Sequence, residues 1–142
     1  MEDRHRRQVL AFQSLYYVVT GLWPLVHLAS FEAVTGPKAD AWLVQMVGLL
    51  AVAAGFALAL ATARGHGRLP VTVALAAGSA IAFAAIDVRY TALGRISPVY
   101  LADAAVELGI VIGLWLTRQG AGPSDDSPEG DQAHGASSPA SL

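Results

Sequence analysis

Residues Ala41–Ala63 read AWLVQMVGLLAVAAGFALALATA, a run that contains no charged side chain. A helix rises about 1.5 Å per residue, so about 20 apolar residues cross the roughly 30 Å hydrocarbon core of a bilayer. This run is therefore long enough to span a membrane as a single helix. Three further stretches share its length and apolar character, at residues 9–29, 69–86 and 98–117. We expect an all-α integral membrane four-helix bundle over residues 1–118.

The overall composition supports a membrane protein and excludes several other classes. Of the 142 residues, 54% are apolar and only 14% are charged, which is unusual for a soluble domain. Cysteine is absent, which excludes disulfides, thiolate metal sites and cysteine nucleophiles. The sequence has no basic footprint for nucleic acid, no phosphate-binding glycine loop and no metal-ligand spacing such as His-Glu-x-x-His. We therefore expect no cofactor, no metal ion and no nucleic-acid partner.

The connections between the predicted spans are short and contain turn residues or charges. They cover residues 30–40, 64–68 and 87–97. Helix starts are marked by a capping residue or an early proline, at Asp40, at Pro70 and at Ser97 with Pro98. The first connection is richer in specific side chains than a minimal turn needs, so a lid over the outer end is an alternative to a simple loop.

Basic residues predict how the bundle is oriented, because Lys and Arg near the ends of spans are retained in the cytoplasm. With the N-terminus inside, six flank the cytoplasmic ends: Arg4, Arg6, Arg7, Arg64, Arg68 and Arg118. Three lie on the outer side: Lys38, Arg89 and Arg95. We expect a multi-pass protein of the bacterial inner (plasma) membrane with both termini cytoplasmic. The first span is expected to be retained rather than cleaved as a signal peptide.

The last segment, residues 119–142, is rich in Gly, Pro, Ser and Asp and has almost no large apolar side chain. Such a composition cannot bury enough apolar surface to order the chain. We expect a disordered cytoplasmic tail.

Ionisable residues within the spans are the candidates for function, because a charge inside a membrane is costly unless it is paired or hydrated. Asp103 and Glu107 are four residues apart and share one helix face, with Tyr100 one turn earlier. Polar residues of the first span recur every seven positions, at Gln13, Thr20 and His27. Asp87 closes the third span at the same outer end. The candidate ligand-binding residues are therefore His27, Asp87, Tyr100, Asp103 and Glu107.

Three interpretations of this polar cluster are open. The carboxyls could be satisfied inside the protein and only fix the helix register, with partners drawn from Arg89, Arg95, Lys38, His27 or tyrosine hydroxyls. They could instead line an outward-opening site for a small lipophilic ligand or a cation, including that of a small proton-coupled transporter. A carboxylate with His27 could also form the acid–base pair of a membrane-embedded enzyme acting on a lipophilic substrate. We favour binding over catalysis and leave enzymatic activity undecided.

Small residues at four-residue spacing let helices approach closely in lipid. This spacing occurs at Ala51 with Gly55, and at Ala74, Gly78 and Ala82. It favours packing within the bundle, with a homo-oligomer as the alternative. The expected partners are thus the lipid bilayer, a small lipophilic ligand or cation, and a second copy of the chain.

The layout resembles that of the DoxX-like small bacterial membrane proteins. The likeness covers the four-helix core, and the residues that carry it are the run Asp87-Val88-Arg89-Tyr90 and the segment from Ser97 to Glu107. The resemblance implies a compact four-helix bundle in the bacterial inner membrane, associated in some relatives with respiratory or redox partners. Small multidrug exporters are similar in size and span count, but they use a glutamate deep in the first helix, where this chain has no carboxylate.

Overall fold

The computed structural model describes the backbone of residues 2–118 and the side chains from Arg4 onwards. This part of the chain forms five helices and no strand: α1 (Glu2–Val26), α2 (Leu28–Thr35), α3 (Ala41–Ala63), α4 (Pro70–Ala92) and α5 (Tyr100–Leu116). Three of them, α1, α3 and α4, are long and apolar enough to cross a membrane. The tail predicted for residues 119–142 lies outside the described residues.

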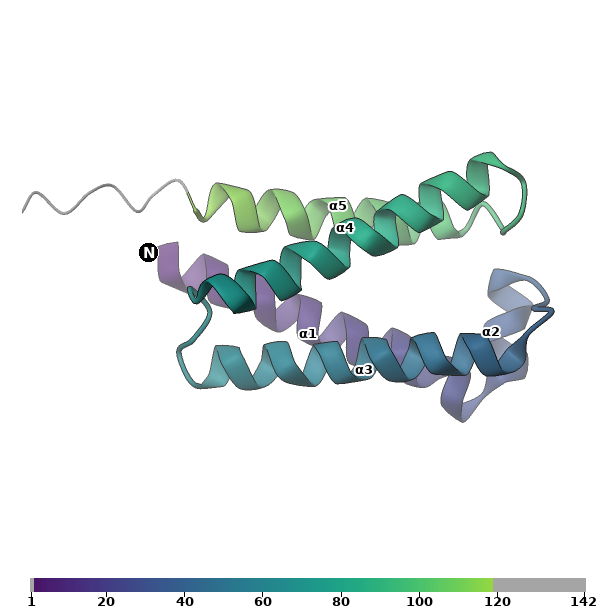
Figure 1. Cartoon of the computed structure of the whole chain (residues 1–142), viewed down its shortest axis with the longest axis horizontal. Helices are drawn as coiled ribbons and strands as arrows, with labels where there is room; N and C mark the ends of the chain where they lie inside the picture. Colours follow the sequence, from purple (N-terminus) through teal and green to yellow (C-terminus); the bar gives the residue numbers. More distant parts are fainter. Residues whose placement is uncertain (1, 119–142) are drawn as a thin grey trace, which may run out of the picture.

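The long helices form two antiparallel hairpins (Figure 1). One hairpin pairs α1 with α3, and the other pairs α4 with α5. The start of α1, the α3–α4 turn and the end of α5 lie at one end of the molecule. The short α2 and the α4–α5 turn lie at the opposite end. Every basic residue predicted to be cytoplasmic is therefore at the first end, and the other three are at the second.

The structure contains five helices where the sequence predicted four, and the additional one is α2. The prediction of an irregular connection over residues 30–40 is wrong in its first half. His27 leaves helical geometry with φ −148°, and its Nδ1 accepts a hydrogen bond from the Ser30 backbone N–H at 3.1 Å. His27 thereby separates α1 from α2 and caps α2, because it satisfies an N–H that the first turn leaves free. Gly36, with φ 87°, then ends α2 in a conformation that glycine adopts readily.

The predicted bounds match the observed ones closely for α3 and α5 but not for α1, which begins at Glu2 rather than at residue 9 and ends at Val26 rather than at residue 29. Helix α3 coincides with residues 41–63, and Pro70 occupies the first turn of α4 as predicted. Asp40 stands at the N-cap of α3, but its side chain makes no capping hydrogen bond. Helix α4 continues to Ala92, past the predicted end at residue 86, so Asp87 lies inside a helix rather than in a connection.

Helices α1 and α3 approach most closely at glycines. A Cβ on Gly48 would lie 2.6 Å from the Gly21 carbonyl oxygen, and a Cβ on Gly55 would lie 2.8 Å from the Ser14 carbonyl oxygen. Both separations are shorter than side chains tolerate, so the close contact requires glycine. Ala51 and Gly55, predicted as a packing pair, are both buried in α3.

Helix α4 is packed through a different stripe from the predicted one. The predicted small residues Ala74, Gly78 and Ala82 are exposed. The buried face instead carries Thr72, Ala76, Ala80, Ala84 and Asp87. This orientation of α4 turns Asp87 toward the inside of the bundle, where an alanine stripe makes room for the neighbouring helices.

A small apolar core joins the two hairpins and consists of Leu10, Leu58, Ala76, Ala80, Ile110 and Leu114. Many large apolar side chains point outward instead, including Leu15, Phe56, Ile81 and Ile112. Exposed apolar surface of this extent is typical of a protein whose outer face contacts lipid or a partner. The polar residues described next lie within the bundle, between this core and the α2 end.

Candidate functional site

Three carboxyl groups from two helices gather inside the bundle. Asp103 and Glu107 come from the same face of α5, and Asp87 comes from the buried face of α4. The Asp87 carboxyl interacts directly with that of Asp103, and the charged neighbours of Glu107 are these same two aspartates. The site is therefore a concentration of carboxyl groups in an apolar surrounding, where a proton or a cation would be stabilising.

Two tyrosines of α1 donate hydrogen bonds to this cluster. The Tyr16 hydroxyl donates to Oδ1 of Asp103, and the Tyr17 hydroxyl lies 3.1 Å from Oε2 of Glu107. Of the partners predicted for the carboxyls, tyrosine hydroxyls are thus the ones that form hydrogen bonds with Asp103 and Glu107. Arg89 is exposed instead, and the ammonium group of Lys38 donates to the Thr35 carbonyl oxygen at 2.8 Å.

Tyr17 is the centre of a hydrogen-bonded chain. Its hydroxyl lies 3.2 Å from Nε2 of Gln13 and 3.2 Å from Oγ of Ser79, while Gln13 also donates to the Ala76 carbonyl oxygen. The Gln13 amide nitrogen can only donate, so the Tyr17 oxygen accepts from it. Ser79 directs its own proton to the Leu75 carbonyl oxygen at 2.7 Å. The single Tyr17 proton can therefore go to Glu107 or to Ser79.

This arrangement accommodates both protonation states of Glu107. An ionised Glu107 accepts the proton of Tyr17. A protonated Glu107 can donate to the Tyr17 oxygen, and Tyr17 then donates to Ser79. Because Glu107 is only 1% exposed, the change would take place away from bulk water.

Asp87 has unused hydrogen-bonding capacity. Its side chain is 6% exposed, and its Oδ2 atom is buried with no hydrogen-bond partner among the described residues. The hydroxyl of Thr91, one turn further along α4, is in the same situation. Buried polar groups are normally paired, so these two atoms mark a place where a ligand could be held.

The remaining candidates lie nearer the α2 end of the molecule. Tyr100 is half-buried at the start of α5, where the Lys38 ammonium lies 5.1 Å from its ring centroid. His27 is exposed and caps α2, ten positions after Tyr17, which corresponds to about 15 Å along a helix. The structure therefore brings Asp87, Asp103 and Glu107 together and leaves His27 outside this cluster.

The sequence interpretation named tyrosine hydroxyls as partners of the carboxyls but did not single out Tyr16 and Tyr17. Tyr17 lies four residues after Gln13 and hence on the same face of α1, which was the available signal. Two aromatic rings add to the site, since Phe83 packs edge-on against Tyr17 at 5.5 Å and Phe12 stacks with Tyr16 at 6.0 Å. Within the described residues, no group of three His, Asp or Glu side chains is arranged to hold a metal ion.

The chain was compared with protein-family models, with characterised proteins and with solved structures, and none of them matches it.

Proposed function

We propose that this chain crosses the bacterial inner membrane four times, and that Asp87, Asp103 and Glu107 form a site where a lipophilic organic cation exchanges with a proton. The observation that carries the proposal is the grouping of three carboxyls, two of which, Asp103 and Glu107, accept their hydrogen bonds from tyrosines, while Asp87 keeps a buried oxygen without a partner among the described residues. Among the described residues no Lys or Arg side chain is shown bonded to these carboxyls, and a proton or a cation would relieve the repulsion between them in apolar surroundings.

The aromatic rings around the cluster favour an organic cation. Tyrosine and phenylalanine rings attract cations through their π faces. Tyr16 and Tyr17 reach the acidic groups from α1, and Phe12 and Phe83 pack against these two tyrosines. Proton exchange is supported by the hydrogen bonds that link Glu107 to Tyr17 and Tyr17 to Ser79. The Tyr17 hydroxyl has a hydrogen-bond partner whether Glu107 is ionised or protonated.

Binding of tetraphenylphosphonium to the detergent-purified protein tests the proposal. Titration calorimetry would measure affinity, and a pH indicator in weak buffer would measure protons released. We expect Glu107→Gln to weaken binding by about tenfold or more, equal to about 1.4 kcal/mol, and to reduce proton release. Asp40→Asn is the matched control, since Asp40 is an exposed carboxylate without a side-chain capping bond.

Two results would count against the site. Equal affinity in the Glu107 and Asp40 variants would mean that the probe binds elsewhere. Binding without proton release in the unaltered protein would remove the exchange and leave a simple cation site. Loss of a pH-driven flux of the probe into liposomes in Glu107→Gln alone would extend the proposal from binding to transport.

A further inference from the structure

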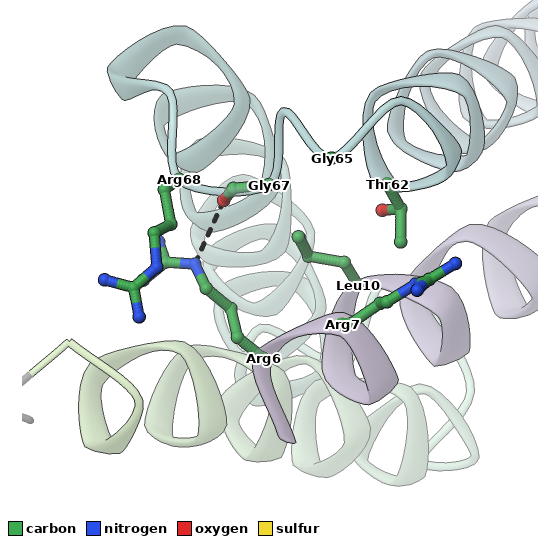
Figure 2. Close-up of a pocket in the computed structure, with 7 residues that line it drawn as sticks. All are labelled: Arg6, Arg7, Leu10, Thr62, Gly65, Gly67 and Arg68. Atoms are coloured by element: carbon green, nitrogen blue, oxygen red, sulfur yellow. Dashed lines mark hydrogen bonds between the residues drawn. The ribbon is translucent and has the colours of Figure 1, made fainter. Parts of the chain in front are cut away.

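A second site lies at the opposite end of the bundle, where the basic residues collect. A cavity of about 320 Å³ opens between the start of α1 and the α3–α4 turn. Arg6 and Arg7 of α1 and Arg68 of the turn line it, together with Leu10, Thr62, Gly65 and Gly67 among the residues whose side chains are described. In Figure 2, Arg6 and Arg68 lie on one side of Leu10, and Arg7 extends on the other side, below Thr62.

The cavity is held in shape by contacts between its two sides. Arg6 is only 7% exposed, and its Nε donates a hydrogen bond to the Gly67 carbonyl oxygen at 3.0 Å (Figure 2). A Cβ on Gly67 would lie 2.9 Å from Cδ1 of Leu10, so the turn is pressed against α1. One guanidinium group is thereby fixed in place before any ligand arrives. Planar guanidinium groups match phosphate oxygens better than any other side chain does.

An apolar groove continues from this cavity along the outside of the bundle. Its volume is about 420 Å³, and it shares Arg7 and Thr62 with the arginine-lined cavity. From there it follows α1 as far as Val18, about 16 Å from Arg7 at 1.5 Å per residue, with α3 as its other wall. Most of its remaining lining is apolar, including Leu15, Phe56 and Ala59. An anion pocket thus leads into a groove that runs along two membrane-spanning helices.

We propose that this end of the protein binds an anionic phospholipid, with its phosphodiester headgroup among Arg6, Arg7 and Arg68 and one acyl chain in the α1–α3 groove. A free phosphate could bind the arginines of the pocket in the same way as a lipid headgroup. Only an amphiphile could also occupy the apolar groove. Basic pockets between helices at the membrane surface are a recurring way to hold anionic lipids. This lipid site is independent of the acidic cluster, because the two sites have no residue in common.

The headgroup part is tested with detergent-purified protein and three additives: phosphatidylglycerol, phosphatidylcholine and inorganic phosphate. Native mass spectrometry would count bound lipid, and thermal unfolding would report stabilisation. We expect retention and stabilisation by phosphatidylglycerol, weakened about tenfold in apparent affinity by Arg7→Gln. Arg64→Gln is the matched control, because Arg64 is exposed at the same end and does not line the cavity. It should bind phosphatidylglycerol as the unaltered protein does.

The acyl-chain part is tested by filling the groove. Ala59→Trp places a large ring in the groove, whereas Ala57→Trp places the same ring on an exposed position of α3 outside it. We expect only the former to reduce phosphatidylglycerol binding. Equal stabilisation by inorganic phosphate would make the pocket a site for free anions and overturn the lipid proposal. Equal binding of phosphatidylcholine, or equal losses in the two tryptophan variants, would overturn it as well.

Discussion

The hydroxyl of Tyr17 lies 3.1 Å from Oε2 of Glu107, and this contact joins α1 to α5 inside the bundle. Both residues are 1% exposed, so water cannot replace either one as the hydrogen-bond partner of the other. A buried carboxyl that loses its donor keeps the cost of desolvation without the compensating bond.

We therefore expect Tyr17→Phe to lower the free energy of unfolding by about 1–3 kcal/mol. Unfolding in mixed micelles, followed by helical circular dichroism, would measure it. Tyr90→Phe is the control, because Tyr90 is exposed and its change should have little effect. In the double variant Tyr17→Phe, Glu107→Gln, the two losses should be less than additive, since each removes the same contact. Strict additivity would mean that the contact contributes nothing.

The glycine contact between α1 and α3 leads to a second prediction. A methyl group on Gly48 would stand 2.6 Å from the Gly21 carbonyl oxygen, so Gly48→Ala should force the helices apart and cost about 1–3 kcal/mol. Gly109→Ala is the control, because nothing lies within 4 Å of its added Cβ, and alanine there should stabilise the helix by about 0.5–1 kcal/mol. Opposite signs in the same unfolding assay are expected. Equal effects would refute the close approach.

The parts of the fold that depend on local sequence signals could be predicted from the sequence, whereas the parts that depend on packing between helices could not. The bounds of α3 were predicted because an uncharged apolar run and a proline-containing turn are local signals. The α1–α2 break was missed because it depends on the backbone of His27, which no periodicity reveals.

The acidic cluster was predicted only in part for a related reason. Asp103 and Glu107 share a face by spacing alone, whereas the meeting with Asp87 depends on how α4 is rotated. That rotation follows from packing between helices, and it also turned the predicted stripe at Ala74 and Gly78 outward. The arginine-lined cavity was missed because it joins Arg6 to Gly67, which are far apart in sequence.

Lys38 ties the segment of residues 28–40 to the start of α5. Its ammonium group lies 5.1 Å from the Tyr100 ring centroid and 5.8 Å from that of Phe31, and it donates to the Thr35 carbonyl oxygen. Lys38→Met should remove about 0.5–1 kcal/mol of cation–π interaction. Hydrogen exchange over residues 28–40 should then become about two- to fivefold faster. Lys38→Arg retains the charge and should exchange at the original rate, and equal acceleration in both variants would contradict the tether.

The orientation of the bundle is open to a direct test, because the chain contains no cysteine and a single introduced one is unique. Ala39, before α3, and His66, in the α3–α4 turn, are exposed and lie at opposite ends of the molecule (Figure 1). Six basic residues collect at the His66 end against three at the other, which predicts that His66 faces the cytoplasm. In intact bacterial cells, a membrane-impermeant maleimide should label Ala39→Cys, and should label His66→Cys only after permeabilisation. The reverse pattern would invert the orientation, and would place the acidic cluster in the cytoplasmic half and the arginine-lined cavity outside. Labelling of both positions in intact cells would argue against one fixed orientation, since α3 alone separates the two residues and must cross the membrane to divide them.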